Sequence, residues 1–169
     1  MNHPKYVIVV GIDFSKASER ALDEAFAVAA TKHGAELHVA NVRPVLGEPP
    51  ALESAPDPLS PWRLWAVELR EYVARRAAAF QATAEVAPFR HLYTHQRMND
   101  PARELAQLAL DVDADLVVVG THDWHGGSQV QGSVAEAVTR LAPCPVLAVR
   151  RKASSAPVSA VPPPAAQRA

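Results

Sequence analysis

Hydrophobic and polar positions change in blocks along the chain, and the blocks predict strands and helices in alternation. Strand-like patterns occupy five segments: 6–12, 37–42, 86–94, 115–120 and 146–150. The runs at 6–12 and 115–120 are nearly continuous in β-branched residues, which is typical of strands buried on both faces of a parallel sheet. The run at 86–94 alternates imperfectly and holds Pro88, which favours a place nearer the sheet edge.

Between these strands, apolar residues recur at helical spacing. The predicted helices follow residue 15, begin at Trp62, begin at Asp100, and span about 133–141. Ser15 or Ser18 can cap the first helix, and Gly34 offers the left-handed conformation that ends such a helix. Asp100 followed by Pro101 is a helix start, since Asp caps well and Pro suits the first helical position.

The alternation of strands and helices predicts an α/β fold whose parallel strands are joined by right-handed crossovers. We expect one domain over 1–152, followed by a Pro- and Ala-rich tail over 153–169 that is disordered. The Pro-rich stretch 44–61 predicts a long loop. Trp62 and Trp65 share a helix face, where core packing or a subunit contact is favoured over a stacking platform.

Composition narrows the function classes. The 169 residues carry a formal net charge of -1, which supplies no electrostatic basis for binding nucleic acid or an anionic membrane. No apolar run approaches the roughly 20 residues that span a bilayer, and no signal peptide precedes the first strand, so we expect a cytoplasmic protein. The lone Cys144, between two prolines, is interpreted as a small buried hydrophobe.

Candidate ligand-binding residues follow two of the predicted strands. In open α/β sheets, ligands lie outside the carboxyl ends of the strands. Asp13 follows the first strand and can accept hydrogen bonds from a ribose. The fourth strand leads into a segment with four of the chain's 7 glycines, Gly120, Gly126, Gly127 and Gly132. These glycines and the helix opening at Ser133 suit an anion, and a tight strand-to-helix turn is the alternative explanation.

Other chemistries have weaker support. Neither G-x-x-x-x-G-K-[ST] nor G-x-G-x-x-G follows the first strand, which argues against a P-loop NTPase and a dinucleotide-dependent dehydrogenase. His122, Asp123 and His125 are compact enough to consider for a divalent metal, and His91 and His95 share a strand face. Neither group shows three convergent ligands, so we expect exposed histidines and no metal site. No catalytic residues are predicted, because Asp13 and Ser15 lack a partnering base.

Several blocks together resemble one known family. They are 11–15 (GIDFS), 99–101 (NDP), 115–122 (DLVVVGTH) and above all 132–150 (GSVAEAVTRLAPCPVLAVR). From about residue 6 to 150, the chain resembles the UspA family of universal stress proteins. The resemblance implies an open five-stranded parallel sheet of order 3-2-1-4-5, adenine-nucleotide alpha-hydrolase-like, with helices on both faces. It also implies a homodimer that pairs through the last strand, 146–150.

One branch of that family binds ATP and carries G-x2-G-x9-G-[ST]. Here Gly120 and Gly132 are in place, but Asp123 occupies the second glycine position and the spacing is one residue shorter. The Asp123 side chain would hinder backbone approach, and a phosphate charge at ~4 Å would cost on the order of 4 kcal/mol at an effective dielectric of 20. The resemblance therefore implies a degraded adenine-nucleotide pocket, with binding of ATP and Mg²⁺ left open.

The nucleotide-binding residues that the resemblance and the strand ends predict are Ile12, Asp13, Ser15, Val42, Gly120, Thr121, Gly126, Gly127, Gly132, Ser133 and Val134. The predicted function is that of a dimeric cytoplasmic stress-response regulator or adaptor with unidentified protein partners. Two alternatives stay open. One is an ATP-binding sensor that switches partners, and the other is a slow ATPase or metal-assisted hydrolase.

Overall fold

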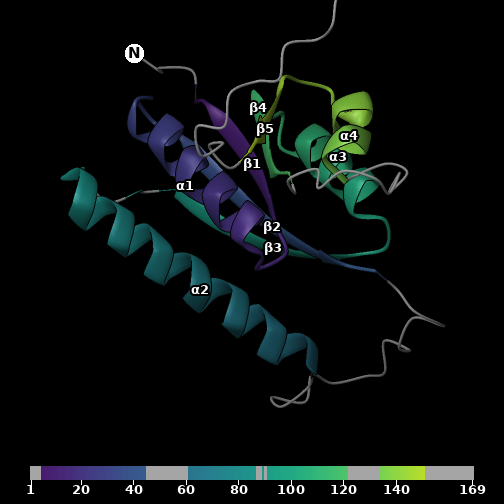
Figure 1. Cartoon of the computed structure of the whole chain (residues 1–169), viewed down its shortest axis with the longest axis horizontal. Coiled ribbons are helices and arrows are strands. Elements are labelled where there is room, and N and C mark those ends of the chain that lie inside the picture. Colours follow the sequence, from purple (N-terminus) through teal and green to yellow (C-terminus); the bar gives the residue numbers. More distant parts are fainter. Residues whose placement is uncertain (1–4, 45–60, 87–88, 90, 122–133, 151–169) are drawn as a thin grey trace, which may run out of the picture.

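The computed structural model describes residues 5–44, 61–86, 89, 91–121 and 134–150, in which strands and helices alternate (Figure 1). The elements are β1 (Val7–Ile12), α1 (Lys16–Ala30), β2 (Glu36–Arg43), α2 (Pro61–Ala84), β3 (His91–Met98), α3 (Pro101–Asp111), β4 (Leu116–Gly120), α4 (Val134–Leu141) and β5 (Val146–Val149). The predicted α/β alternation is confirmed. Most of the 44–61 loop and the whole 153–169 tail lie outside the described residues.

The five strands form one parallel sheet in the order β3-β2-β1-β4-β5, as expected. From β1 the chain adds β2 and then β3 on one side, and it then returns to place β4 on the other side of β1. The strand order therefore reverses between β1 and β4. In the register, Ile12 lies opposite Asn41 of β2, and Gly11 lies opposite Val119 of β4. The carboxyl ends of these three strands therefore meet at one edge of the sheet.

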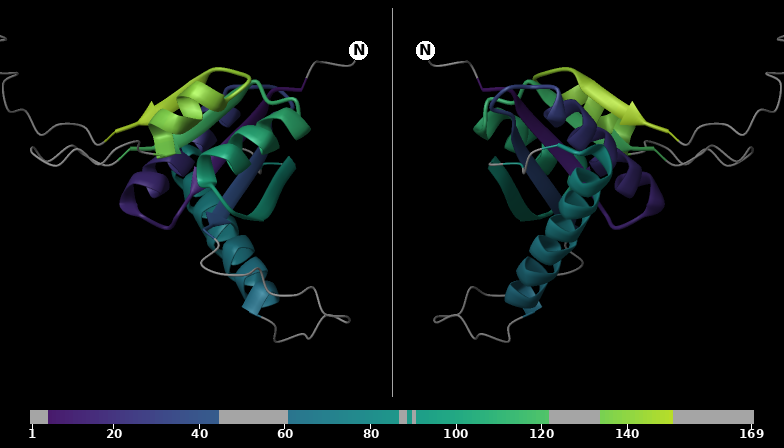
Figure 2. Two further views of the ribbon diagram at one scale, coloured as in Figure 1. Left: turned by 90° about the vertical axis from the view of Figure 1, so that its right-hand side faces the viewer. Right: turned by 90° about the vertical axis from the view of Figure 1, so that its left-hand side faces the viewer.

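Helices cover both faces of the sheet, α1 and α2 on one side and α3 and α4 on the other (Figures 1 and 2). Alternate residues of β1 pack against the helices on the two faces of the sheet. Ile8 and Val10 pack with Phe26 of α1 on one face, whereas Val9 packs with Leu108 of α3 on the other. Because both faces are covered, β1 is apolar at nearly every position, which explains the continuous run in the sequence.

The helix starts follow their capping residues. Ser15 caps α1, because its Oγ accepts the Ser18 N–H at 3.2 Å. Asp100 caps α3, where its Oδ1 accepts the Arg103 N–H at 2.8 Å. The prediction for Gly34 was wrong in position. The α1 helix is already capped by Thr31, and Gly34, with φ of 68°, lies in the turn that leads to β2.

The third strand was predicted at 86–94, but β3 runs from His91 to Met98. The reason is its partner: all eight residues of β2 pair with β3, from Glu36 opposite His91 to Arg43 opposite Met98. Backbone hydrogen bonds to β2 therefore make this polar segment a strand, although its own pattern of hydrophobic positions does not predict one. Its predicted place at the sheet edge is confirmed.

Candidate functional site at the carboxyl ends of β1, β2 and β4

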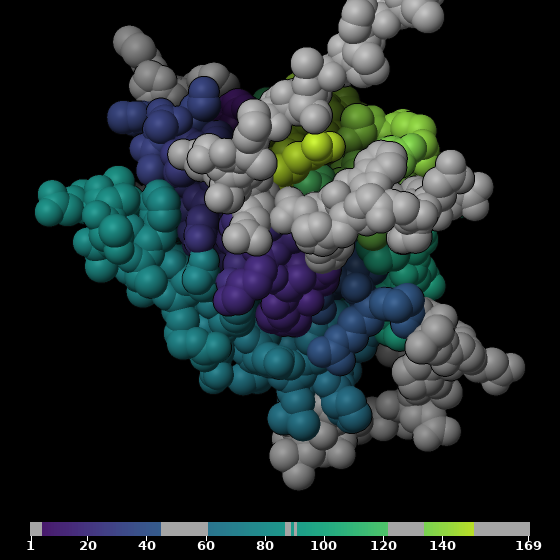
Figure 3. Space-filling model, in the orientation of Figure 1, coloured from purple at the N-terminus to yellow at the C-terminus, as the bar shows by residue number. Residues whose placement is uncertain are grey.

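The turn after β1 holds an exposed carboxylate in a defined place. Asp13 follows the last residue of the strand, and its Oδ1 accepts the N–H of Ser15 at 3.0 Å. Its own N–H donates to Ser18 Oγ at 3.2 Å. Asp13 and Lys16 are exposed, and the purple amino-terminal part of the chain forms part of the surface in Figure 3. The carboxylate is therefore held by the backbone N–H of Ser15 at an exposed edge of the sheet.

Phe14 makes this turn possible by adopting a left-handed backbone with φ of 63°. That conformation costs a non-glycine residue on the order of 1 kcal/mol. The Phe14 ring meets the Tyr72 ring edge to face, with centroids 5.0 Å apart. This contact with α2 helps to offset the backbone cost and fixes the direction in which the turn leaves β1.

At the end of β4, Gly120 has a packing role. A Cβ atom on Gly120 would lie 2.4 Å from both the carbonyl carbon and oxygen of Ala17, and 2.8 Å from the Ser18 nitrogen. Only a glycine lets the start of α1 approach β4 this closely. The next residue, Thr121, donates its N–H to the Val149 carbonyl at 2.9 Å, which ties β4 to β5 at the same edge. The described structure therefore gives Gly120 a packing role against α1, which neither the anion-binding nor the turn interpretation had predicted.

The end of β2 carries a polar residue that was not predicted. Asn41 is 4% exposed, and its Nδ2 donates to the Ile12 carbonyl at 2.6 Å. Its Oδ1 accepts the Trp65 Nε1–H at 2.7 Å, and Trp65 is itself only 3% exposed. The expected core packing of the Trp pair is confirmed for Trp65, while Trp62 is 45% exposed. An Asn within an otherwise apolar strand was the sequence signal for this network.

The predicted site residues divide into three groups. Ile12, Asp13, Ser15, Gly120 and Thr121 lie together at the ends of β1 and β4. Val42 is half-buried at the neighbouring end of β2, and Val134 is exposed at the first residue of α4. The remaining predicted residues, Gly126, Gly127, Gly132 and Ser133, and also Asp123, lie outside the described residues.

No three metal-ligating side chains come together within the described residues. The segment with His122, Asp123 and His125 is not among them. His91 is exposed as expected, but the expectation for His95 was wrong. Its Nε2 lies 2.9 Å from Nδ1 of His38 on β2, which sequence reasoning did not pair with it. Burial lowers the pKa of both rings, and that of His95 falls to about 4, so both are neutral near pH 7.

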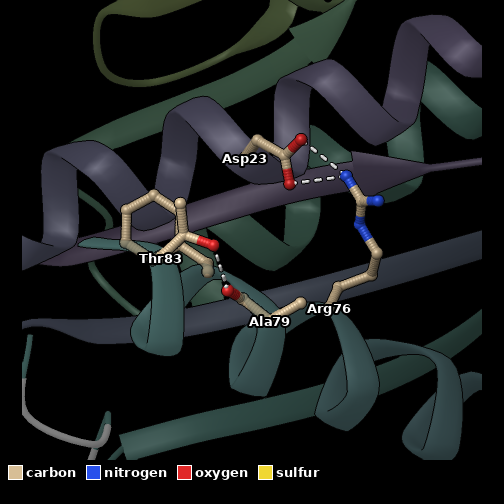
Figure 4. Close-up of a pocket in the computed structure, with 5 residues that line it drawn as sticks. Asp23, Arg76, Ala79 and Thr83 are labelled. Carbon is tan, nitrogen blue, oxygen red and sulfur yellow. Dashed lines mark hydrogen bonds and ion pairs between the residues drawn. The ribbon is translucent and has the colours of Figure 1, made fainter. Parts of the chain in front are cut away.

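A concave region lies between α1 and α2, away from this edge (Figure 4). Its volume is about 290 Å³, and its lining includes an ion pair between Asp23 and Arg76. Arg76 donates through one nitrogen to both carboxylate oxygens of Asp23, at 2.7 and 2.5 Å. Thr83 donates to the Ala79 carbonyl at 2.9 Å. None of the predicted ligand residues lines it, so the strand ends remain the candidate site.

Two further observations bear on the excluded classes. Among the helices that the structure describes, none has the length and apolar character to cross a bilayer. Burial raises the pKa of the Cys144 thiol, and the residue packs at the margin of the core beside α3 and α4. Both the raised pKa and the packing agree with a structural cysteine, since reactive thiols need a stabilised thiolate.

The fold and this edge define a class of protein, an open parallel α/β domain whose ligands meet the strand ends where the strand order reverses. The sequence pattern of the universal stress protein family matches residues 6–150. The chain belongs to that family.

Individual relatives agree with this assignment. A 46-residue segment is 48% identical to Universal stress protein A homolog 1 from Coxiella burnetii, and it covers 27% of this chain and 32% of that protein. That match therefore spans about a third of the relative's length. A universal stress protein in complex with cAMP is 30% identical, with a TM-score of 0.59, and the match covers 86% of this chain and 96% of the other.

More distant solved structures share the fold. UspA from Lactobacillus plantarum is 24% identical with a TM-score of 0.62, over 88% of this chain and all of that one. A universal stress protein family member from Arabidopsis thaliana, with AMP bound, is 18% identical with a TM-score of 0.56, over 91% and 97% of the two chains. These likenesses extend the fold assignment across widely separated organisms.

Proposed function

We propose that this protein is a stress-response regulator or adaptor that binds an adenine nucleotide at the carboxyl ends of β1, β2 and β4 and acts through its ligand state. The observation that carries this proposal is the exposed Asp13 carboxylate, anchored at the point where the strand order reverses. A relative with 30% identity was crystallised with cAMP, and a more distant one with AMP. Adenine nucleotides are thus the ligand class to test first.

The described residues suit the nucleoside part of such a ligand. The Asp13 carboxylate accepts the Ser15 N–H through Oδ1, and carboxylate oxygens, which accept more than one hydrogen bond each, match the hydroxyl donors of a ribose. Of the two apolar residues predicted here, Ile12 is buried in the core beside α1 and α2, and Val42, at the end of β2, is half-buried on the other face of the sheet. The amino end of α4, at Val134, supplies the positive end of a helix dipole for a phosphate.

We further propose that the pocket favours a nucleotide with one phosphate over ATP. Asp123 stands where ATP-binding relatives are expected to carry glycine, and the four residues 128–131 contain no Lys or Arg. Each added phosphate brings more negative charge toward a segment, 121–133, whose sequence contains this carboxylate and no Lys or Arg. The same argument predicts that Mg²⁺ partly restores ATP binding by neutralising that charge.

Calorimetric titration of AMP, cAMP and ATP, with and without Mg²⁺, tests the proposal. We expect saturable binding of AMP or cAMP and weaker binding of ATP. Asp123→Gly is expected to tighten ATP about tenfold, equivalent to about 1.4 kcal/mol, while changing AMP affinity little. Asp13→Asn is the matched control, and it should weaken all three. Absence of binding of every nucleotide by the unmodified protein and by Asp123→Gly would refute nucleotide binding and leave an interaction module.

We propose that the active form is a homodimer joined through β5 and its flanking residue, 146–150. Within the described chain, β5 pairs with β4 along one side only, and its sequence is Val-Leu-Ala-Val. An apolar strand at a sheet edge is an aggregation hazard unless a partner covers it. Light scattering at micromolar concentration is expected to give twice the 18.2 kDa mass, and a monomer would contradict the proposal.

The remaining alternatives stay predictions. ATP-dependent partner switching requires ATP binding, so the titration decides it first. Slow hydrolysis requires product release, which a phosphate assay on the same ATP and Mg²⁺ mixture measures directly. A cytoplasmic location likewise remains a prediction, and the protein partners remain to be identified.

A further inference from the structure

A buried chain of hydrogen bonds connects β1, β2 and α2 directly beneath the candidate site. Trp65 of α2 donates its Nε1–H to Asn41 Oδ1 at 2.7 Å, and Asn41 Nδ2 donates to the Ile12 carbonyl at 2.6 Å. Asn41 and Trp65 are 4% and 3% exposed. The Arg43 guanidinium lies 4.4 Å from the centre of the Trp65 ring and covers it at the surface.

The orientation of the Asn41 amide follows from its partners. Indole Nε1–H is only a donor, so it must face the amide oxygen, and the amide nitrogen must then face the Ile12 carbonyl, which is only an acceptor. An amide in an apolar strand is costly to bury unless its groups are paired. Here each end of the amide has a partner, so this residue can hold the Ile12 carbonyl in one direction.

That carbonyl belongs to the peptide unit that leads into Asp13. The Ile12 C=O and the Asp13 N–H lie in one planar group. Asn41 holds the carbonyl from β2, and Ser18 Oγ of α1 accepts the N–H at 3.2 Å. The peptide is therefore held on opposite sides by two different elements. Its plane sets the direction in which the Asp13 side chain leaves the strand.

We propose that Asn41 is a positioning residue of the nucleotide site, which holds the Ile12–Asp13 peptide so that the Asp13 carboxylate faces the ribose. This inference rests on the proposed function. Trp65 supports it indirectly by fixing the Asn41 amide. Asn41 itself is buried below the edge and does not touch the ligand.

Asn41→Asp, assayed at alkaline pH so that the carboxyl group is ionised, tests the inference because an ionised carboxylate keeps an acceptor for Trp65 and has no donor for Ile12. Trp65→Phe is the matched control. It leaves Asn41 Oδ1 without its donor and so also lowers stability, but it keeps the bond from Asn41 to Ile12. We expect Asn41→Asp to weaken AMP binding at least about tenfold and Trp65→Phe to weaken it less than about threefold, at a similar loss of Tm.

A second variant and a second measurement complete the test. Asn41→Thr suits a strand and is too short to reach both partners, so it replaces Asn41→Asp if that variant does not fold. Amide hydrogen exchange at Asp13 is measured without ligand, and it should accelerate at least about tenfold in the Asn41 variants relative to Trp65→Phe.

The outcomes separate the inference from the proposed function. Equal AMP affinity in the unmodified protein and the Asn41 variants would overturn the inference and leave nucleotide binding intact. If the unmodified protein binds neither AMP nor cAMP, the proposed function fails, and Asp13 exchange alone decides the positioning role. Exchange at Asp13 that does not change in the Asn41 variants would then overturn it as well.

Discussion

Gly120→Ala is a sharp test of how β4 and α1 fit together at the site. The added methyl group would lie 2.4 Å from the Ala17 carbonyl carbon and oxygen and 2.8 Å from the Ser18 nitrogen. All three are backbone atoms in the first turn of α1, so no side-chain rotation can make room. The helix start must move away from the sheet.

The geometry gives the size of the effect. Carbon atoms in good contact lie about 3.5–4.0 Å apart, so the first turn of α1 must retreat by about 1 Å. Overpacking against atoms that cannot rotate away costs about 3 kcal/mol. Replacing glycine by alanine also restricts the unfolded chain and returns about 0.5–1 kcal/mol. The net expected loss in the free energy of unfolding is therefore about 2 kcal/mol.

Urea denaturation measures this loss, and Gly11→Ala is the matched control. A methyl group on Gly11 would lie 2.7 Å from Leu105 Cδ1, the end of a flexible side chain that can turn aside. We expect Gly11→Ala to cost less than about 1 kcal/mol, with the same slope of free energy against urea. A Gly120→Ala variant that is as stable as the unmodified protein, or more stable than Gly11→Ala, would refute the packing role of Gly120.

Two more predictions concern charged and titratable groups. The pKa of His95 is lowered to about 4 by burial, by His38 and by Arg97. In the unfolded chain His95 binds a proton below about pH 6.5, whereas in the folded chain it binds one only below about pH 4. The free energy of unfolding should be highest above pH 6.5 and fall by on the order of 1 kcal/mol at pH 5, since solvent screens this half-buried ring, and urea denaturation at pH 7.5 and 5 measures the difference. His95→Gln should flatten this dependence, and an unchanged slope would contradict the assignment. Asp23→Asn removes the half-exposed carboxylate that pairs with Arg76 and should cost about 1 kcal/mol in dilute buffer and less in 1 M NaCl. An equal loss at both salt concentrations would point to a cause other than the ion pair.

Some parts of the molecule were determined locally and could be predicted from the sequence. The continuous β-branched runs of β1 and β4 predict strands buried on both faces, because only a covered strand is apolar at every position. Ser15 and Asp100 act on N–H groups three residues ahead, so the starts of α1 and α3 depend on neighbouring residues alone. The strand order came from the resemblance of motifs and not from the pattern of hydrophobic positions.

Other features depend on residues that are far apart in the sequence. Only the ladder with β2 decides that β3 extends to Met98, because its own pattern is weak. Gly120 was predicted to face an anion, yet the described contact that requires a glycine is with Ala17, about a hundred positions away in the sequence. The pairing of His38 with His95 likewise needs the β2–β3 register.

For the candidate site, the sequence by itself determined which residues follow the strands, because strand ends and glycine-rich segments are local patterns. Asp13 and Thr121 were found in this way. Only the tertiary structure decided what holds them. Asn41 is noticeable in the sequence as one polar residue in an apolar strand, but its function depends on meeting Ile12 and Trp65. Packing of three separate elements brings those partners within hydrogen-bonding distance, and a local sequence pattern does not predict contacts between elements that are far apart in the sequence.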